Sequence, residues 1–112
     1  MLHKVFISPN NFESVIRACY NEEYNNEFYL SYDSRVNNVL KYNEGGTSFK
    51  IENKEGVIVG FFVMKGDVIN DTYIRKIFRI SSYLSAINQL INEETVLKTN
   101  ASLSFSRNKI LN

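Results

Sequence analysis

The residues best suited to chemistry lie at the predicted start of a helix. Arg79 is followed by Ser81 and Ser82, and either serine can serve as a helix N-cap. The free backbone N–H groups and the dipole of a helix N-terminus favour an anion such as phosphate. A helix start with two serines can therefore bind an anion.

Four carboxylates are candidates for a catalytic base. Asp67 and Asp71 lie in predicted turn segments, and Glu93 and Glu94 lie toward the end of the predicted helix. A base must lie within hydrogen-bond reach of the proton it removes. The alternative is that each carboxylate is a solvated turn or helix-end charge.

The single cysteine and the single histidine limit the remaining chemistry. Cys19 has no second thiol for an internal disulfide, and with His3 it makes no Cys/His metal-ligand set. Cys19 falls on the apolar stripe of a predicted helix, which favours a buried small hydrophobe over a reactive thiol. His3 has no partner in the sequence and is expected at a surface or a strand end.

Composition bounds the class of protein. The 112 residues, with hydrophobic and charged fractions of 44% and 22%, predict one domain over residues 1–112. A formal net charge of +1 gives no case for nucleic acid or an anionic membrane as the main partner. Arg75, Lys76 and Arg79, with Arg107 and Lys109, form either a basic patch or a solvated face.

The chain is expected to be cytoplasmic. The apolar run before Ser8 is too short for a signal peptide, and no segment approaches the ~20 apolar residues that cross a bilayer. A single cysteine fits a reducing compartment. The high content of Asn, Ile, Lys and Tyr indicates an AT-rich bacterial or phage genome.

The first half of the chain predicts a strand and two helices. Residues 5–7 form the strand, and Ser8 with Pro9 starts a helix. That helix carries an apolar stripe at helical spacing: Phe12, Val15, Ile16, Cys19 and Tyr20. Residues 21–32 are interpreted as a loop or frayed helix end. Asp33 is the predicted N-cap of a second helix with Val36, Val39 and Leu40 inward, which Gly45-Gly46 ends.

The second half begins with a β-hairpin over residues 47–64. Its second strand is apolar on both faces apart from Gly60, which predicts a covered central strand with a bulge or a close approach at the glycine. Lys65-Gly66-Asp67 and Asn70-Asp71 are predicted turns, and Val68-Ile69 is too short to assign.

The segment over residues 72–80 fits two structures. A strand ending near Phe78 would place Ile74, Phe78 and Ile80 on one face, and a helix from Asp71 is the alternative. A helix then follows with four inward residues, Leu84, Ile87, Leu90 and Ile91. Residues 95–98 are a predicted strand, and residues 104–112 a predicted terminal helix.

Aromatic residues concentrate in the polar segment after the first helix. Tyr24, Phe28, Tyr29 and Tyr32 are candidates for a protein interface, because exposed aromatic side chains are typical of such surfaces. Packing of these rings over the sheet is the alternative.

The order of elements resembles that of the GNAT family of N-acetyltransferases. Residues 7–13 look like the opening strand and its turn into the first helix. Residues 49–62, with Gly56 and Gly60, resemble the central hairpin, residues 73–78 lie where the fourth strand is expected, and residues 104–111 look like the last helix. The resemblance implies an α/β (α+β) fold with a mixed, mostly antiparallel sheet flanked by helices, shortened at the C-terminus by two strands.

For chemistry, the resemblance implies acyl transfer from acetyl-CoA to an amine. It places the cofactor near Val63, Arg79, Ser81, Ser82 and Tyr83. The chain departs from the family's pyrophosphate loop, because Ser82 stands where glycine is usual, Leu84 stands where glycine or alanine is usual, and no glycine follows Gly66. The family's base and acid have no counterpart, since residues 72–80 contain no carboxylate and the final segment no tyrosine.

Two functions of different class follow. The first is a non-catalytic GNAT-like scaffold without a cofactor, which forms an oligomer or binds a protein partner. It would be a phage-encoded accessory or virion protein, or an inhibitor of a host enzyme. The alternative is an acetyl-CoA-dependent N-acyltransferase with a divergent pyrophosphate-binding loop. The missing glycines, base and acid favour the first.

Overall fold

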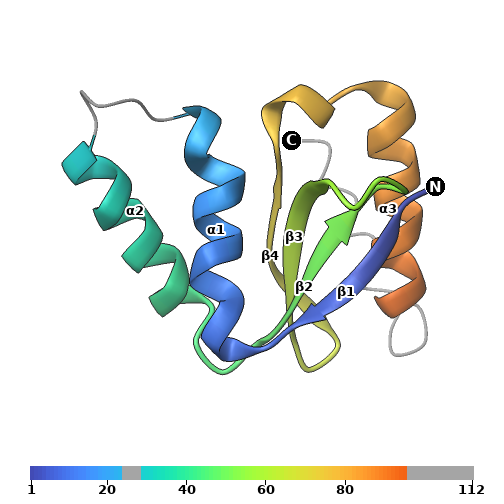
Figure 1. Ribbon diagram of the computed structural model, residues 1–112. Helices are drawn as coiled ribbons and strands as arrows, with labels where there is room; N and C mark the ends of the chain where they lie inside the picture. The colour runs from blue at the N-terminus through green and yellow to red at the C-terminus, as the bar shows by residue number, and fades with distance from the viewer. Residues whose placement is uncertain (24–28, 96–112) are drawn as a thin grey trace.

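A computed structural model describes residues 1–23 and 29–95 and has an α+β fold (Figure 1). Its elements, in chain order, are β1 (His3–Ile7), η1 (Pro9–Asn11), α1 (Phe12–Tyr20), η2 (Asn21–Glu23), α2 (Tyr29–Tyr42), β2 (Thr47–Glu52), β3 (Ile58–Lys65), β4 (Val68–Ile74), η4 (Lys76–Phe78) and α3 (Ser81–Thr95).

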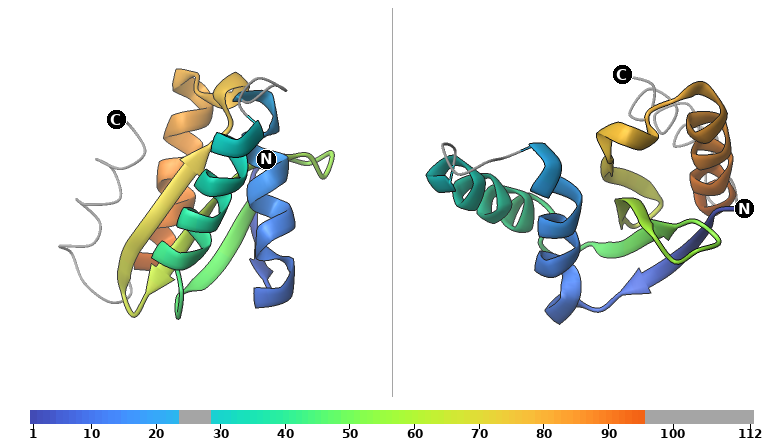
Figure 2. Two further views of the ribbon diagram at one scale, coloured as in Figure 1. Left: turned by 90° about the vertical axis from the view of Figure 1, so that its left-hand side faces the viewer. Right: turned by 45° about the horizontal axis from the view of Figure 1, so that its top comes forward.

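The four described strands form one antiparallel sheet in the order β1-β2-β3-β4. Helices α1 and α2 lie on one side of the sheet and α3 lies on the other (Figure 2). The predicted α+β class and the flanking helices are therefore confirmed. Every pairing among the described strands is antiparallel, so the described sheet contains none of the parallel pairing that a mixed sheet requires.

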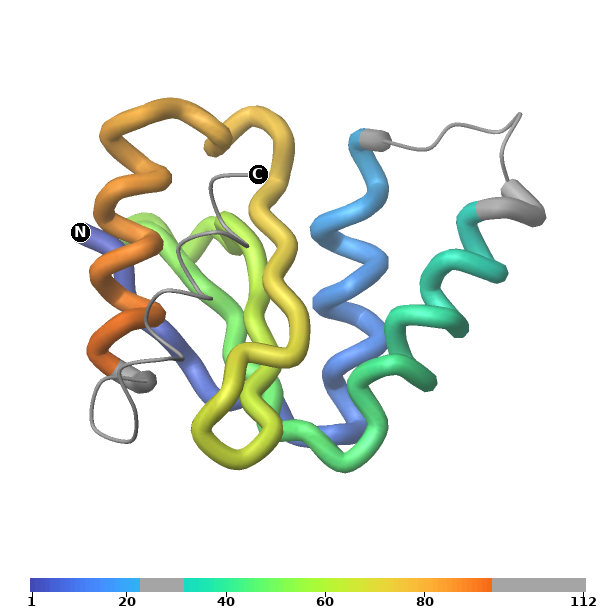
Figure 3. The backbone as a smooth tube through the Cα atoms, turned by 180° about the vertical axis from the view of Figure 1, so that it is seen from behind, coloured from blue at the N-terminus to red at the C-terminus, as the bar shows by residue number. Residues whose placement is uncertain are grey.

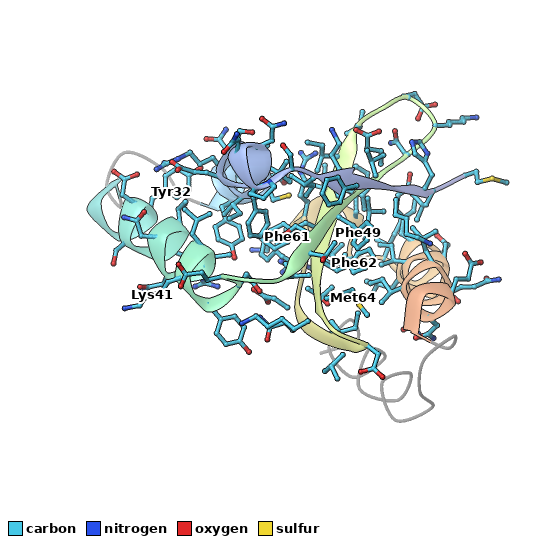
Figure 4. All side chains as sticks on the ribbon, turned by 90° about the horizontal axis from the view of Figure 1, so that it is seen from below. Tyr32, Lys41, Phe49, Phe61, Phe62 and Met64 are labelled. Carbon is cyan, nitrogen blue, oxygen red and sulfur yellow. The ribbon has the colours of Figure 1, made fainter. Side chains whose placement is uncertain are left out.

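Strand β3 carries the core on both of its faces. Phe61 and Val63 are fully buried in a cluster with α1 and α2, where Phe61 meets Phe12 edge-on at 5.4 Å between ring centroids. Phe62 and Met64 point to the other side, toward Ile87 of α3 (Figure 4). The sequence prediction of a covered central strand is thus confirmed, and its apolar run is explained by two separate layers of helix.

Helix α1 follows its predicted pattern closely. All five residues of the apolar stripe are buried against the sheet and α2: Phe12, Val15, Ile16, Cys19 and Tyr20. The start differs slightly, because Ser8 and Pro9 begin the short η1 turn and α1 begins only at Phe12. The Ser8 side chain makes no capping hydrogen bond, whereas its carbonyl accepts from the Asn11 N–H.

The prediction that Asp33 caps α2 is wrong. The helix begins at Tyr29, and Asp33 accepts a hydrogen bond from Arg17 of α1 at 2.8 Å. The Asp33 carboxylate therefore pairs with a side chain of α1 instead of capping the backbone N–H groups of α2. The end of α2 is as predicted, since the helix stops at Tyr42 and Gly45 has a positive φ of 85°.

The predicted turn at Asn70-Asp71 is also wrong, because both residues lie inside β4. A register shift next to Met64 makes a β-bulge at this point. Asn70 and Asp71 both hydrogen-bond the side chain of Asn43, at 2.8 and 2.9 Å. Asn43 is only 4% exposed, so these bonds satisfy a buried amide at the end of α2. Tertiary hydrogen bonds thus override the local turn preference of Asn-Asp.

The strand expected to end near Phe78 ends at Ile74. Pairing with β3 stops there, after a final bond from the Arg75 N–H to the Val59 carbonyl at 2.9 Å. The next residues form η4 rather than strand or α-helix. The inward residues predicted for α3 are confirmed, with Ile87 and Ile91 fully buried. Thr95 ends α3 instead of starting a strand, and residues 96–98 and 104–112 lie outside the described residues.

Gly60 lies at a close contact, as its place in the strand predicts. The register between β2 and β3 shifts next to it, so that Ile51 faces Gly60 and Glu52 faces Ile58. A Cβ at Gly60 would overlap the Tyr73 carbonyl oxygen on β4. The contacting atom belongs to the backbone, so it cannot move without displacing β4.

We predict that Gly60→Ala lowers the free energy of unfolding by about 2–3 kcal/mol, because the new methyl group must push two paired strands apart. Urea denaturation measures this loss. Gly56→Asn is the matched control. Gly56 has a φ of 81° with nothing within 4 Å, and asparagine tolerates that conformation. Equal stability of Gly60→Ala and the wild type would contradict the close packing of β3 on β4.

Candidate functional site

The candidate site is the connection between β4 and α3, residues 75–83. It turns over the end of the sheet from the last described strand to the start of α3, as seen from behind in Figure 3. Hydrogen bonds from the Phe78 N–H to the Arg75 carbonyl and from the Arg79 N–H to the Lys76 carbonyl close η4. The bond from Leu84 N–H to Ile80 carbonyl, at 2.9 Å, then starts an ordinary α-helix.

Ser81 and Ser82 occupy the first turn of α3, and both are exposed. Ile80 supplies the first helical carbonyl, so the N-cap lies one residue before the predicted serines. The first turn contains no acidic residue. Its N–H groups and hydroxyls can therefore donate to an anion, although the turn lacks the glycines that let a phosphate approach a backbone closely.

Arg79 is held against the end of β4. Its Nε donates to the Ile74 carbonyl at 2.6 Å, and its guanidinium lies 5.1 Å from the centroid of the Tyr73 ring. These contacts support the strand end and the aromatic ring beneath it. The predicted cofactor residue Arg79 therefore stabilises the end of β4 through these two contacts.

The other two predicted cofactor residues are packing groups. Tyr83 stacks on Phe78, with ring centroids 5.2 Å apart, and joins the α3 side of the core. Val63 is fully buried on the opposite side of the sheet and pairs with Asp71 in the middle of β4. The structure therefore brings Arg79, Ser81, Ser82 and Tyr83 into one connection and leaves Val63 apart from them.

Arg75 fixes the beginning of the connection to α1. Its guanidinium contacts the Glu22 carboxylate at 2.6 Å and donates to the Ile58 carbonyl at 2.7 Å. Three elements meet at this side chain: the end of β4, the start of β3 and the turn after α1. Such charge-assisted bonds are stronger than bonds between neutral groups.

The candidate bases do not gather at this site. Asp71 accepts from Asn43 and from the Thr72 N–H, so it supports the bulge in β4. Asp67 lies in the turn between β3 and β4, and Glu93 is exposed near the end of α3. The side chain of Glu94 is outside the described residues. Residues 72–92 contain no Asp or Glu at all, so no carboxylate belongs to the connection itself.

Of the four aromatic residues predicted to form an interface, the structure describes the side chain of one, Tyr32. Tyr32 is half-buried between α1 and α2, where its hydroxyl donates to the Arg17 carbonyl at 2.8 Å. The Arg17 guanidinium lies 5.4 Å from the Tyr32 ring centroid, and burial raises the pKa of the phenol. Tyr24 and Phe28 lie outside the described residues, and so does the side chain of Tyr29. Their role in an interface stays a prediction.

The structure reveals an exposed apolar pair that the sequence interpretation missed. Ile77 and Ile80, on the connection, are 62% and 54% exposed, and Lys76 beside them is also exposed. We call these three residues the Ile77–Ile80 patch. The strand prediction had placed Ile80 inward with Ile74, yet only Ile74 is buried. No local signal in the sequence marks Ile77 and Ile80 as exposed, because their exposure depends on where β4 stops pairing with β3.

Cys19 and His3 behave as the sequence predicts. Cys19 is fully buried, and burial raises the pKa of its thiol to about 12. His3 lies on β1 with its Nε2 3.3 Å from a Glu52 carboxylate oxygen on β2. Among the described residues, no group of three or more His, Cys, Asp or Glu side chains is placed to hold a metal ion. No helix in this part of the chain is long and apolar enough to span a membrane.

Comparison with protein-family models, with curated proteins and with solved structures gives no match for this chain. The candidate site must therefore be interpreted from its own geometry.

We predict that Cys19 does not react in the folded protein. With its pKa at about 12, the thiol stays protonated at pH 8, and thiolate forms only as the pH rises toward that value. Iodoacetamide should therefore leave the native protein unlabelled at pH 8 and add one group in concentrated guanidinium chloride. Labelling of the native protein at the rate of the unfolded chain would contradict the burial of Cys19.

Proposed function

We propose that this chain is a non-catalytic domain with a GNAT-like arrangement, and that it binds another protein through the Ile77–Ile80 patch. The observation that carries the proposal is the pair of exposed isoleucines on the connection that follows β4. Exposed apolar side chains that are bordered by positively charged residues are typical of protein interaction surfaces. Strand β4, the last strand of the described sheet, lies next to this surface.

The order of the described elements supports the GNAT-like arrangement. It runs strand, two helices, three antiparallel strands and a helix, which is the order of the family resemblance up to α3. The local chemistry supports a non-catalytic role. The connection is a closed turn without glycine, Arg79 is bonded to the sheet, and no carboxylate is present in residues 72–92.

The charges of the connection indicate an acidic partner. Lys76 is exposed and makes no ion pair with a carboxylate of the described residues, and Arg79 adds a second positive charge. Two copies of this surface would bring like charges together, so pairing with a second copy is disfavoured. A partner with an acidic rim around apolar residues would match both properties. A phage accessory or virion protein, or an inhibitor of a host enzyme, would use such a surface in the cytoplasm.

We predict that Ile77→Asp/Ile80→Asp abolishes binding of the partner while the fold is retained, because both side chains are exposed. Purified protein serves as bait in a cytoplasmic extract, and the captured proteins are compared between variants. Val57→Asp is the matched control, since Val57 is an exposed apolar residue in the β2–β3 loop.

Lys76→Glu should weaken the same capture, and added salt should weaken it further. Light scattering on the bait alone tests self-association. Capture that survives Ile77→Asp/Ile80→Asp, or a dimer that depends on these isoleucines, would overturn the proposal of an acidic partner at this surface.

The alternative function is acetyl-CoA-dependent N-acyl transfer. One observation favours it: Ser81 and Ser82 are exposed in the first turn of α3, with no acidic residue beside them. An anion at this position would gain from the helix dipole and from the free N–H groups.

We predict no heat when acetyl-CoA is titrated into the protein in a calorimeter, because the turn has no glycine cradle and Arg79 is bonded to β4. Desulfo-CoA and ADP are the controls for the thioester and for the pyrophosphate. Micromolar binding of acetyl-CoA that is lost in Ser82→Asp would contradict the non-catalytic proposal and support the transferase.

A further inference from the structure

A second site lies at the opposite end of the sheet from the Ile77–Ile80 patch. A cavity of about 430 Å³ opens between the end of β1, the start of α1, the end of α2 and the start of β2. Figure 1 shows these four chain segments together at the lower end of the fold, whereas η4 and the start of α3 lie at the upper end. The volume falls within the range of small-molecule sites, roughly 300–1,000 Å³.

The floor of the cavity is apolar. Ile7 and Phe12 are buried members of the core on the α1 and α2 side, and Leu40 packs against that core. A ligand seated here would therefore remove apolar surface from water, which is the main source of affinity in such sites. Gly45, with its positive φ, forms part of the wall and contributes no side chain at its own position.

Ser48, a largely buried residue, lines the cavity with a hydroxyl that is available to a ligand. Ser48 is 7% exposed, and its side chain has no hydrogen-bond partner among the described residues. Its neighbour in the wall, Asn43, differs. The Asn43 amide donates to Val39 and Asp71 and accepts from Asn70, so it is already satisfied and held in place. A hydroxyl that no protein group engages can donate a hydrogen bond to a ligand or accept one from it.

The charge of the lining selects the class of ligand. Glu44 is the one ionisable side chain among the lining residues, all of which are described, and it is exposed at the edge of the cavity. Glu44 makes no ion pair with a cation of the described residues, so its carboxylate attracts positive charge and disfavours anions. We infer that this cavity binds a small protonated amine with an aryl or alkyl body. The apolar part would lie on Ile7, Phe12 and Leu40, and the ammonium group would donate to Ser48 and Glu44.

Benzylamine, benzyl alcohol and benzoate are matched probes that share one ring and differ in charge. Each is titrated into the full-length ¹⁵N-labelled protein, and amide shifts are followed by NMR. Benzylamine should shift the amides of Gly45, Gly46 and Ser48, benzyl alcohol should bind more weakly, and benzoate should produce no shift. Equal binding of benzoate, or benzylamine shifts confined to other parts of the chain, would overturn the inference.

Two substitutions separate the polar contacts. Ser48→Ala and Glu44→Gln should each weaken benzylamine binding about five-fold, as expected for loss of one hydrogen bond or one exposed charge contact. Glu55→Gln, an exposed carboxylate in the β2–β3 loop, should leave the affinity unchanged.

Glu44 is exposed, so its substitution tests the site even when Ser48→Ala perturbs folding. Unchanged affinity in Glu44→Gln would overturn the assignment of an amine. Ile77→Asp/Ile80→Asp should not alter benzylamine binding. The proposed ligand site and the proposed protein surface can therefore be tested independently of each other.

Discussion

The fold depends on a single strand that must be covered on both faces. β3 is apolar almost throughout, and it lies between β2 and β4 with helices on either side. Phe61 and Val63 need α1 and α2, while Phe62 and Met64 need α3. Neither helical layer alone would remove this strand from water, so the hydrophobic effect requires both. The register between β2 and β3 shifts next to Gly60, and the absence of a Cβ there leaves room for the Tyr73 carbonyl of β4.

Polar contacts then fix how the layers are placed. The Asn43 amide joins the end of α2 to the bulge of β4, and Arg75 joins the end of β4 to the turn after α1. Apolar packing is non-directional, whereas these bonds specify one position for each partner. The first lies at the bulge in the middle of β4, and the second lies at the residue that follows the end of the strand. The cavity adjoins the first of them and the Ile77–Ile80 patch adjoins the second, so both candidate surfaces are held by rigid contacts.

The sequence predicts those parts of the fold whose signal is local. The stripe of α1, the β2–β3 hairpin and the inward residues of α3 follow from hydrophobic spacing, and the structure confirms them. The first part of β4 was not predictable in this way, because Asn70 and Asp71 resemble a turn until Asn43 supplies their hydrogen bonds from 27 and 28 residues away. The site follows the same division. Arg79, Ser81 and Ser82 share one connection as their spacing indicates, whereas the exposure of Ile77 and Ile80 depends on where β4 stops pairing.

The register of β1 has a consequence for the order of folding. His3 pairs with Glu52 and Ile7 with Ser48, so this edge strand joins the sheet only after α1 and α2 have been looped out between the partners. The meander from β2 to β4 closes through short turns, so its pairing costs far less loop-closure entropy than the pairing of β1 with β2. A nucleus built from β2, β3 and β4 would therefore form first. β1 would then dock last, and in doing so it would complete the wall of the cavity that opens beside Ile7.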